Sequence, residues 1–148
     1  MDFNSILVAT DFSDCSGVAF IAAQTLAQKF DSRLIVLHVI DQNFVDKLSS
    51  HIGKSREEVV KELRHKAEKD MAAFLKKWNL AGYEVDTLIA TGTPFQEIAV
   101  LARDLVADLV VVGGSGRKGR GKIEEVFFGS TAEKVVRLLP CPVLCIPK

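Results

Sequence analysis

The chain lacks net charge, because its 19 lysine and arginine residues balance its 19 aspartate and glutamate residues. General nucleic-acid binding requires a basic domain, so this balance argues against it. The chain also lacks any apolar run near the roughly 18 residues that a membrane-spanning helix needs. Residues 1–4 lack the basic and hydrophobic regions of a secretory signal. We therefore expect a cytoplasmic protein that binds neither nucleic acid nor membranes.

Cysteine is scarce, and the three residues Cys15, Cys141 and Cys145 form no Cys-x-x-Cys pair. Their odd number and spacing exclude a disulfide framework and a cysteine-rich zinc site, so we expect reduced thiols. Cys141 and Cys145 lie in an apolar run and are expected to be buried small side chains. The sequence also lacks a Ser-His-Asp order, an H-E-x-x-H motif and a paired carboxylate cluster. No catalytic residue and no metal ligand are therefore assigned.

Five short apolar runs predict the strands of a sheet that is covered on both faces. They comprise residues 5–10, 33–39, 83–90, 108–113 and 142–146. Helical patterns separate them, and the resulting β-α-β-α-β-α-β-α-β order is typical of an open parallel sheet wrapped by helices. At 148 residues the chain is expected to form one domain.

Helix starts are marked by capping residues. Ser13 is the expected N-cap of a helix that runs to Phe30. Its helical spacing predicts a buried stripe of Val18, Ile21, Ala22, Leu26 and Phe30. Later helices are expected to begin at Ser55, at Thr93 and at Ser130, with the helix from Ser55 ending near Gly82. Residues 41–54 are expected to be irregular, with at most a helical turn at residues 44–48.

The fourth apolar run leads directly into a glycine-rich, basic segment. Six glycines lie from Gly113 to Gly129, among the cationic side chains of Arg117, Lys118, Arg120 and Lys122. Glycine allows backbone N–H groups to approach a ligand closely. The helix expected at Ser130 adds unpaired N–H groups and the positive end of a dipole. The segment predicts a phosphate site, and a solvated basic loop is the alternative.

Two well-known nucleotide-binding patterns match this segment only in part. Residues Gly114 to Gly119 fit G-x-G-x-x-G, but a loop follows where the dinucleotide-binding fold begins a helix. Residues Gly116 to Lys122 approach the P-loop pattern, but Ile123 replaces the serine or threonine that holds magnesium. Neither pattern assigns the site.

Several short motifs, taken in order along the chain, carry a family resemblance. They are Thr10-Asp11-Phe12-Ser13, Leu37-His38-Val39-Ile40, Gly92-Thr93-Pro94, Val112-Gly113-Gly114-Ser115-Gly116, Gly129-Ser130 and the segment from Pro140 to Pro147. Together they resemble the universal stress protein (UspA) family over the whole chain. The resemblance implies one α/β domain over residues 1–148, with a five-stranded open parallel sheet in the order 3-2-1-4-5. This fold is Rossmann-like and similar to that of the adenine nucleotide alpha hydrolases.

The resemblance also implies an ATP site, with or without Mg²⁺. The matching residues are Ala9, Asp11, Val39, Val112, Gly113, Ser115, Gly116, Arg117, Gly129, Ser130 and Thr131. In the family, the aspartate contacts ribose or phosphate, the valine lies against adenine, and the glycine loop with its hydroxyls holds the phosphates. The family's ATP-binding branch carries G-x2-G-x9-G-(S/T), whereas the spacer here, Arg117 to Phe128, has twelve residues. It is either a basic flap that adds contacts or a loop that has diverged from ATP binding.

The expected topology agrees with this site. Ligands of open α/β sheets bind beyond the carboxyl ends of the strands, where the strand order reverses. There Asp11 and the Gly113 loop should face each other. Simpler alternatives are that Asp11 only precedes a helix, that Ser130 only caps one, and that Glu124 and Glu125 are solvated rather than magnesium ligands. The apolar last strand would be an exposed edge, and the resemblance implies a homodimer through it.

Three functions follow from these observations. The first is a stress-response regulator that binds ATP or a related adenine nucleotide. The second is a dimeric interaction module of the same fold that binds no nucleotide, which the long spacer favours. The third is an enzyme that hydrolyses ATP slowly or transfers an adenylyl group, although no residue is identified that would activate water.

Overall fold

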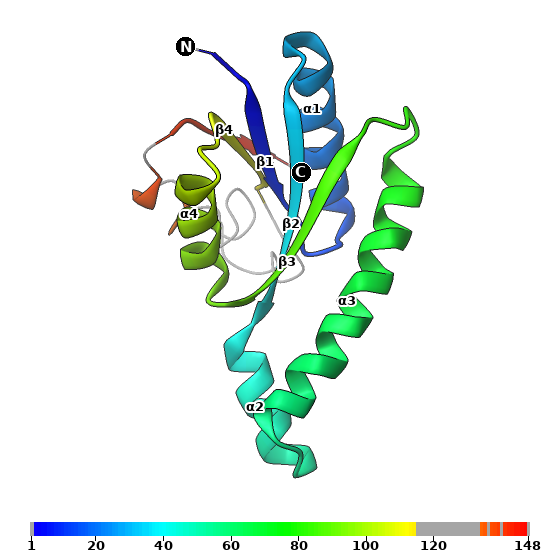
Figure 1. Ribbon diagram of the computed structural model, residues 1–148, viewed down its shortest axis with the longest axis vertical. Coiled ribbons are helices and arrows are strands. Elements are labelled where there is room, and N and C mark those ends of the chain that lie inside the picture. Colours follow the sequence, from blue (N-terminus) through cyan, green and yellow to red (C-terminus); the bar gives the residue numbers. More distant parts are fainter. Residues whose placement is uncertain (1, 115–133, 136, 140, 148) are drawn as a thin grey trace.

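The structure is a computed structural model, and it describes residues 2–114, 134–135, 137–139 and 141–147. Five strands form one parallel sheet in the order β3-β2-β1-β4-β5, which confirms the predicted order (Figure 1). The strands are β1 (Ser5–Ala9), β2 (Arg33–Asp41), β3 (Val85–Gly92), β4 (Leu109–Gly113) and β5 (Val143–Ile146). The central strand β1 pairs with β2 and β4, so that Ile6 lies level with Leu34 and Leu109.

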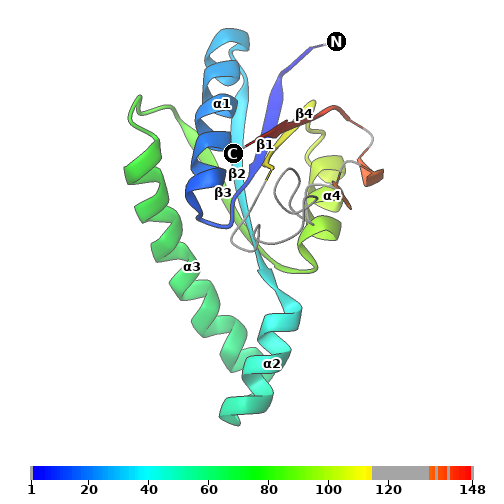
Figure 2. The ribbon, with the colours of Figure 1, turned by 180° about the vertical axis from the view of Figure 1, so that it is seen from behind.

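Helices cover both faces of the sheet, as predicted (Figures 1 and 2). On one face lie α1 (Asp14–Phe30) and α3 (Arg56–Trp78), and on the other lies α4 (Pro94–Asp104). Residues 134, 135, 137 and 138 are also helical, and Val135 packs in the same cluster as α4. Successive residues of β1 point to opposite faces, so Ile6 and Val8 join the core under α1 while Leu7 joins the core under α4.

The buried face of α1 differs from the one predicted. Val18, Ile21 and Phe30 are 43–51% exposed, whereas Ala19, Phe20, Ala23 and Ala27 are completely buried. The helix is apolar around most of its circumference, so helical spacing alone does not select one face. Small side chains let α1 lie close to the sheet, which places the small face inward and the branched side chains outward. The prediction was therefore wrong for Val18, Ile21 and Phe30, whereas Leu26 is half-buried and packs against this core.

The connection after β2 is also more regular than predicted. It forms an eleven-residue helix, α2 (Gln42–Ile52), instead of a short turn. The Asp41 side chain caps its start by accepting from the Asn43 N–H at 2.9 Å, and Gly53 ends it in the left-handed conformation (φ 68°).

The helix α2 packs against the beginning of α3, and together they project past the carboxyl ends of the strands (Figure 1). We call α2 with residues 56–67 of α3 the arm. It has its own small core of Ile40, Val45, Val59 and Ala67. Because Val45 and Val59 are completely buried, the arm is a packed part of the fold.

The predicted helix starts are confirmed in part. Ser13 and Ser55 cap α1 and α3, each accepting a backbone N–H at 3.2 Å. The Thr93 side chain makes no capping bond, and its hydroxyl instead accepts from the Gln42 side chain at 2.9 Å. The helix α3 ends at Trp78, before Gly82, and Asn79 follows as its cap. Among the described residues, no helix is both long and apolar enough to cross a membrane.

Candidate functional site

The carboxyl ends of β2, β1 and β4 form the central part of one edge of the sheet. Ala9 lies level with Leu37, and the Thr10 N–H extends this ladder by donating to the Leu37 carbonyl at 2.8 Å. Asp11 and Val39 each lie two residues beyond the Ala9–Leu37 pair, at the carboxyl edge of the sheet. The strand order reverses between β1 and β4, which is where open α/β sheets bind ligands. The structure therefore brings Asp11, Val39 and the end of β4 to one edge.

Asp11 lies in a turn held by its own side chains. Its Oδ1 accepts from the Ser13 N–H at 3.0 Å, and the Thr10 hydroxyl accepts from the Phe12 N–H at 2.9 Å. The buried Thr10 hydroxyl is also 2.7 Å from the Ser16 hydroxyl in the first turn of α1. These bonds fix the half-buried Asp11 between the end of β1 and the start of α1. At this position, Asp11 can stabilise the turn and can also accept a hydrogen bond from a ligand.

Phe12 gives this turn an uncommon backbone conformation. Its φ of 67° lies in the left-handed region, which is costly for a large side chain. The ring stacks on His38 with centroids 4.2 Å apart and meets the edge of Phe74 at 6.0 Å. The His38 Nδ1 is in turn 2.8 Å from the Thr10 carbonyl oxygen. His38 is thus a half-buried histidine held by the Thr10 backbone, and Phe12 is held in place by aromatic packing.

Gly113, at the end of β4, lies against the start of α1. A Cβ at this position would be 3.1 Å from the Cys15 Sγ and 3.4 Å from the Cys15 carbonyl group. The following residue, Gly114, donates its N–H to the Ile146 carbonyl of β5 at 2.7 Å. The absence of a side chain at Gly113 is therefore explained first by the close approach of α1 to the sheet. Sequence reasoning had assigned that absence to a ligand.

Three of the predicted residues share the face of the sheet covered by α4. Ala9 and Val39 are half-buried, Val112 is buried, and all three pack in one apolar cluster. An apolar surface next to a carboxylate suits a nucleoside, because the base needs a flat nonpolar contact and the ribose hydroxyls need an acceptor.

The remaining predicted site residues lie outside the described residues. They are Ser115, Gly116, Arg117, Gly129, Ser130 and Thr131. The alternative magnesium ligands Glu124 and Glu125 also lie there. Among residues 2–114 and the described parts of 134–147, no group of three or more histidine, cysteine or acidic side chains could hold a metal ion.

The three cysteines are half-buried, less than predicted for Cys141 and Cys145. Burial, reinforced by the nearby Cys15, raises the pKa of the Cys145 thiol. Burial, reinforced by the Asp108 carboxylate, raises the pKa of the Cys141 thiol. Both side chains are therefore neutral thiols at physiological pH, which is consistent with the expected reduced state.

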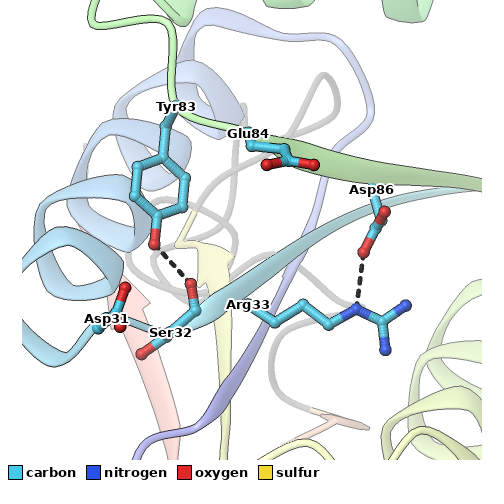
Figure 3. Close-up of a pocket in the computed structure, with 6 residues that line it drawn as sticks. All are labelled: Asp31, Ser32, Arg33, Tyr83, Glu84 and Asp86. Carbon is cyan, nitrogen blue, oxygen red and sulfur yellow. Dashed lines mark hydrogen bonds and ion pairs between the residues drawn. The ribbon is translucent and has the colours of Figure 1, made fainter.

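A separate hollow of about 470 Å³ lies at the opposite end of the sheet, near the starts of β2 and β3 (Figure 3). Its lining comprises Asp31, Ser32, Arg33, Tyr83, Glu84 and Asp86. The Tyr83 hydroxyl donates to the Ser32 carbonyl at 2.5 Å, and Arg33 pairs with Asp86 at 2.6 Å. These contacts join the strand starts to the end of α1, so we assign the hollow a structural role.

Sequence reasoning missed two parts of the site. It did not identify Phe12 as an anchor, because a φ above zero at phenylalanine has no signature in composition or spacing. It also assigned Thr93 to helix capping, whereas Thr93 links the start of α4 to Gln42 of α2. The polar pair Gln42 and Thr93 offered no signal, since the two residues are distant in sequence.

Comparisons with known proteins agree with this geometry. A model described as the universal stress protein family matches residues 2–147. The universal stress protein MJ0531 of Methanocaldococcus jannaschii is 31% identical over 147 residues, which cover 99% of this chain and 83% of the relative. A universal stress protein of Thermus aquaticus is 32% identical over 145 residues, with 97% and 98% covered.

Solved structures show the same relationship. The UspA protein of Lactobacillus plantarum superposes with a TM-score of 0.78 at 27% identity, and the match covers 99% of each chain. A universal stress protein in complex with cAMP superposes with a TM-score of 0.73 at 22% identity, covering 99% of this chain and 98% of the other. The second comparison demonstrates a shared fold.

Proposed function

Because this chain belongs to the universal stress protein family, we propose that it binds ATP or a related adenine nucleotide and acts as a nucleotide-responsive regulator. One observation carries the proposal: the ordered Asp11 turn and the ends of β2 and β4 meet where the strand order reverses. That position is the usual ligand site of this architecture.

The chemistry of the described residues supports a nucleoside. The half-buried Ala9 and Val39, backed by the buried Val112, offer apolar contacts for a purine, and Asp11 offers an acceptor for ribose hydroxyls. In this proposal the phosphates lie toward the segment that follows Gly113, where the sequence holds glycines, hydroxyls and the cation Arg117. A structural neighbour in complex with cAMP supports the choice of an adenine nucleotide, since it has the same fold. The cytoplasm, where ATP is abundant, is the proposed location.

The first test examines what the purified protein carries. The protein is denatured immediately after purification, and released nucleotides are identified by chromatography and mass spectrometry. We expect ATP or ADP, or, if the protein is empty, binding of added ATP in calorimetry. A ligand present at 100 times its Kd should stabilise the fold by about 2.7 kcal/mol. An empty protein that shows neither binding nor a thermal shift would contradict the proposal and favour the interaction module.

A second test locates the site with matched aspartate variants. Asp11→Asn keeps an oxygen for the Ser13 N–H but removes the charge and part of the acceptor capacity. It should weaken ATP binding at least tenfold, which corresponds to about 1.4 kcal/mol of binding free energy. The stability of the fold should change little. Asp14→Asn is the control, because Asp14 lies three residues along the chain with its side chain 81% exposed and paired with Lys77. Equal affinities for the two variants would reject the assignment of Asp11.

We also propose that two copies associate through β5. This four-residue strand pairs with β4 along one edge, and its side chains from Val143 to Ile146 are half-buried. An apolar edge strand favours pairing with another strand. Light scattering should give the mass of a dimer, and replacing Leu144 with lysine should produce monomers. A monomeric wild-type protein at micromolar concentration would refute this part of the proposal.

A further inference from the structure

Phe12 joins the proposed nucleotide site to the arm. Its backbone belongs to the turn that holds Asp11, whereas its ring packs against the arm core of Ile40, Val45, Val59 and Ala67. The same ring also packs against the main core under α1 and α3. A movement of the Asp11 turn therefore acts directly on the packing of α2 and α3.

The conformation of Phe12 depends on the packing of its ring. In the described state, φ is 67° and the ring lies between His38 and Phe74. Left-handed backbone is unfavourable for a large L-residue, so this state persists only because the ring contacts compensate for it. Loss of these contacts would let φ return to a negative value and the ring leave the arm core, which defines a second state. Such a pair of states responds to any ligand that prefers one of them.

A ligand at Asp11 would prefer the described state. Asp11 Oδ1 accepts from the Ser13 N–H, and this bond together with the bond from Phe12 N–H to Thr10 fixes the turn. A ligand that binds the carboxylate in this position makes its contacts only while the turn is formed. Its binding energy therefore adds to the stability of the state in which the Phe12 ring is packed.

We propose that Phe12 couples nucleotide binding at Asp11 to the packing of the arm, so that the bound protein presents an ordered α2 and the free protein a looser one. This inference rests on the proposed function. The signal passes through the stacked Phe12 and His38 rings to the arm core, and through Phe74 toward Trp78, whose ring centroid is 6.4 Å from that of Phe74. The arm is the surface through which the presence of bound nucleotide would be communicated to a partner protein.

Hydrogen exchange of the full chain, with and without saturating ATP, tests this coupling. In the wild-type protein, ATP should slow exchange of the α2 amides and of residues 56–67 by about fivefold, the lower end of ordinary coupling. Phe12→Leu, which cannot stack on His38, should bind ATP more weakly, since coupling is reciprocal, and at saturating ATP it should lose this protection of the arm. The emission of Trp78, the only tryptophan, is a second readout, because its change with ATP should vanish in the same variant.

Phe30→Leu is the matched control, because Phe30 is 51% exposed and lies outside the arm core. It should retain the full response. Calorimetry on every variant measures ATP binding, and it thereby separates the proposed nucleotide binding from the proposed coupling to the arm. Absence of ATP binding to the wild-type protein would overturn both. ATP binding without arm protection, or protection that survives in Phe12→Leu, would overturn the coupling alone. Phe12→Met, which keeps the bulk without the ring, replaces the leucine variant if that variant does not fold.

Discussion

The indole of Trp78 lies directly on Gly17 of α1, and a Cβ at residue 17 would be only 2.1 Å from the Trp78 Cε2. This contact joins α3 to α1 where the two helices cover the same face of the sheet. The half-buried Trp78 ring packs against the core under α1, so relieving the clash would cost some of that packing.

Gly17→Ala should therefore destabilise the protein by about 1–3 kcal/mol, despite the higher helix propensity of alanine. Chemical denaturation followed by far-UV circular dichroism measures this effect. Combining it with Trp78→Leu should recover part of the loss, because the two residues are in contact. An alanine variant as stable as the wild type would show that the helices separate freely.

Tyr83 stabilises the opposite end of α1. Its hydroxyl donates to the Ser32 carbonyl at 2.5 Å and lies 3.2 Å from the Ala27 carbonyl (Figure 3). Tyr83→Phe removes this hydroxyl and keeps the ring, so the free energy of unfolding should fall by about 1–2 kcal/mol. The thermal unfolding midpoint should decrease, while nucleotide affinity should not change because the site lies at the other end of the sheet. A weakened affinity would show that the two ends are coupled.

Thr10 should matter for both stability and binding. Its buried hydroxyl accepts from the Phe12 N–H and contacts the Ser16 hydroxyl. Thr10→Val keeps the shape but leaves the Phe12 N–H without this acceptor, which should cost about 1–3 kcal/mol. Thr10→Ser keeps the oxygen and should restore most of the stability and of the ATP affinity. Equal behaviour of the two variants would contradict a role for the hydroxyl.

The thiols of Cys141 and Cys145 should react slowly with iodoacetamide at pH 7.5. Burial is the main cause that raises their pKa above the ordinary 9.0, so less thiolate is present than in the unfolded chain. Alkylation of both residues, measured by mass spectrometry, should accelerate as the pH rises past 9.0. At any pH below 9.0 it should be faster for the protein unfolded in urea than for the folded protein. Rapid labelling of the folded protein at neutral pH would contradict this prediction.

The parallel sheet was predictable because the sequence places helical patterns between apolar runs, whereas the strand order was implied by the family resemblance. The buried face of α1 was not predictable by spacing. Val18 and Ile21 are more hydrophobic than Ala19 and Ala23, but the close approach of the helix to the sheet favours the smaller side chains. That approach is a tertiary property, and it outweighs the local pattern.

The helix α2 could have been found from its ends. Asp41 and Gly53 are ordinary cap residues at helical separation, but only Val45 is buried between them. Its apolar residues Phe44, Val45, Leu48 and Ile52 also recur at helical spacing, so periodicity indicated the helix as well. Likewise, Asp11 and Val39 were recognised by resemblance, whereas Phe12 required the backbone dihedral that only the structure supplies.

The contact between Gly113 and Cys15 affects how mutations in the glycine motif are interpreted. Residue 113 sets the spacing between α1 and the sheet, and the turn from Thr10 to Ser13 leads directly into that helix. A side chain at position 113 would therefore displace the turn, even in a protein without any bound nucleotide. Loss of binding in a Gly113 variant would reflect displacement of α1 as well as a lost ligand contact. Only a substitution in the turn itself separates these two causes.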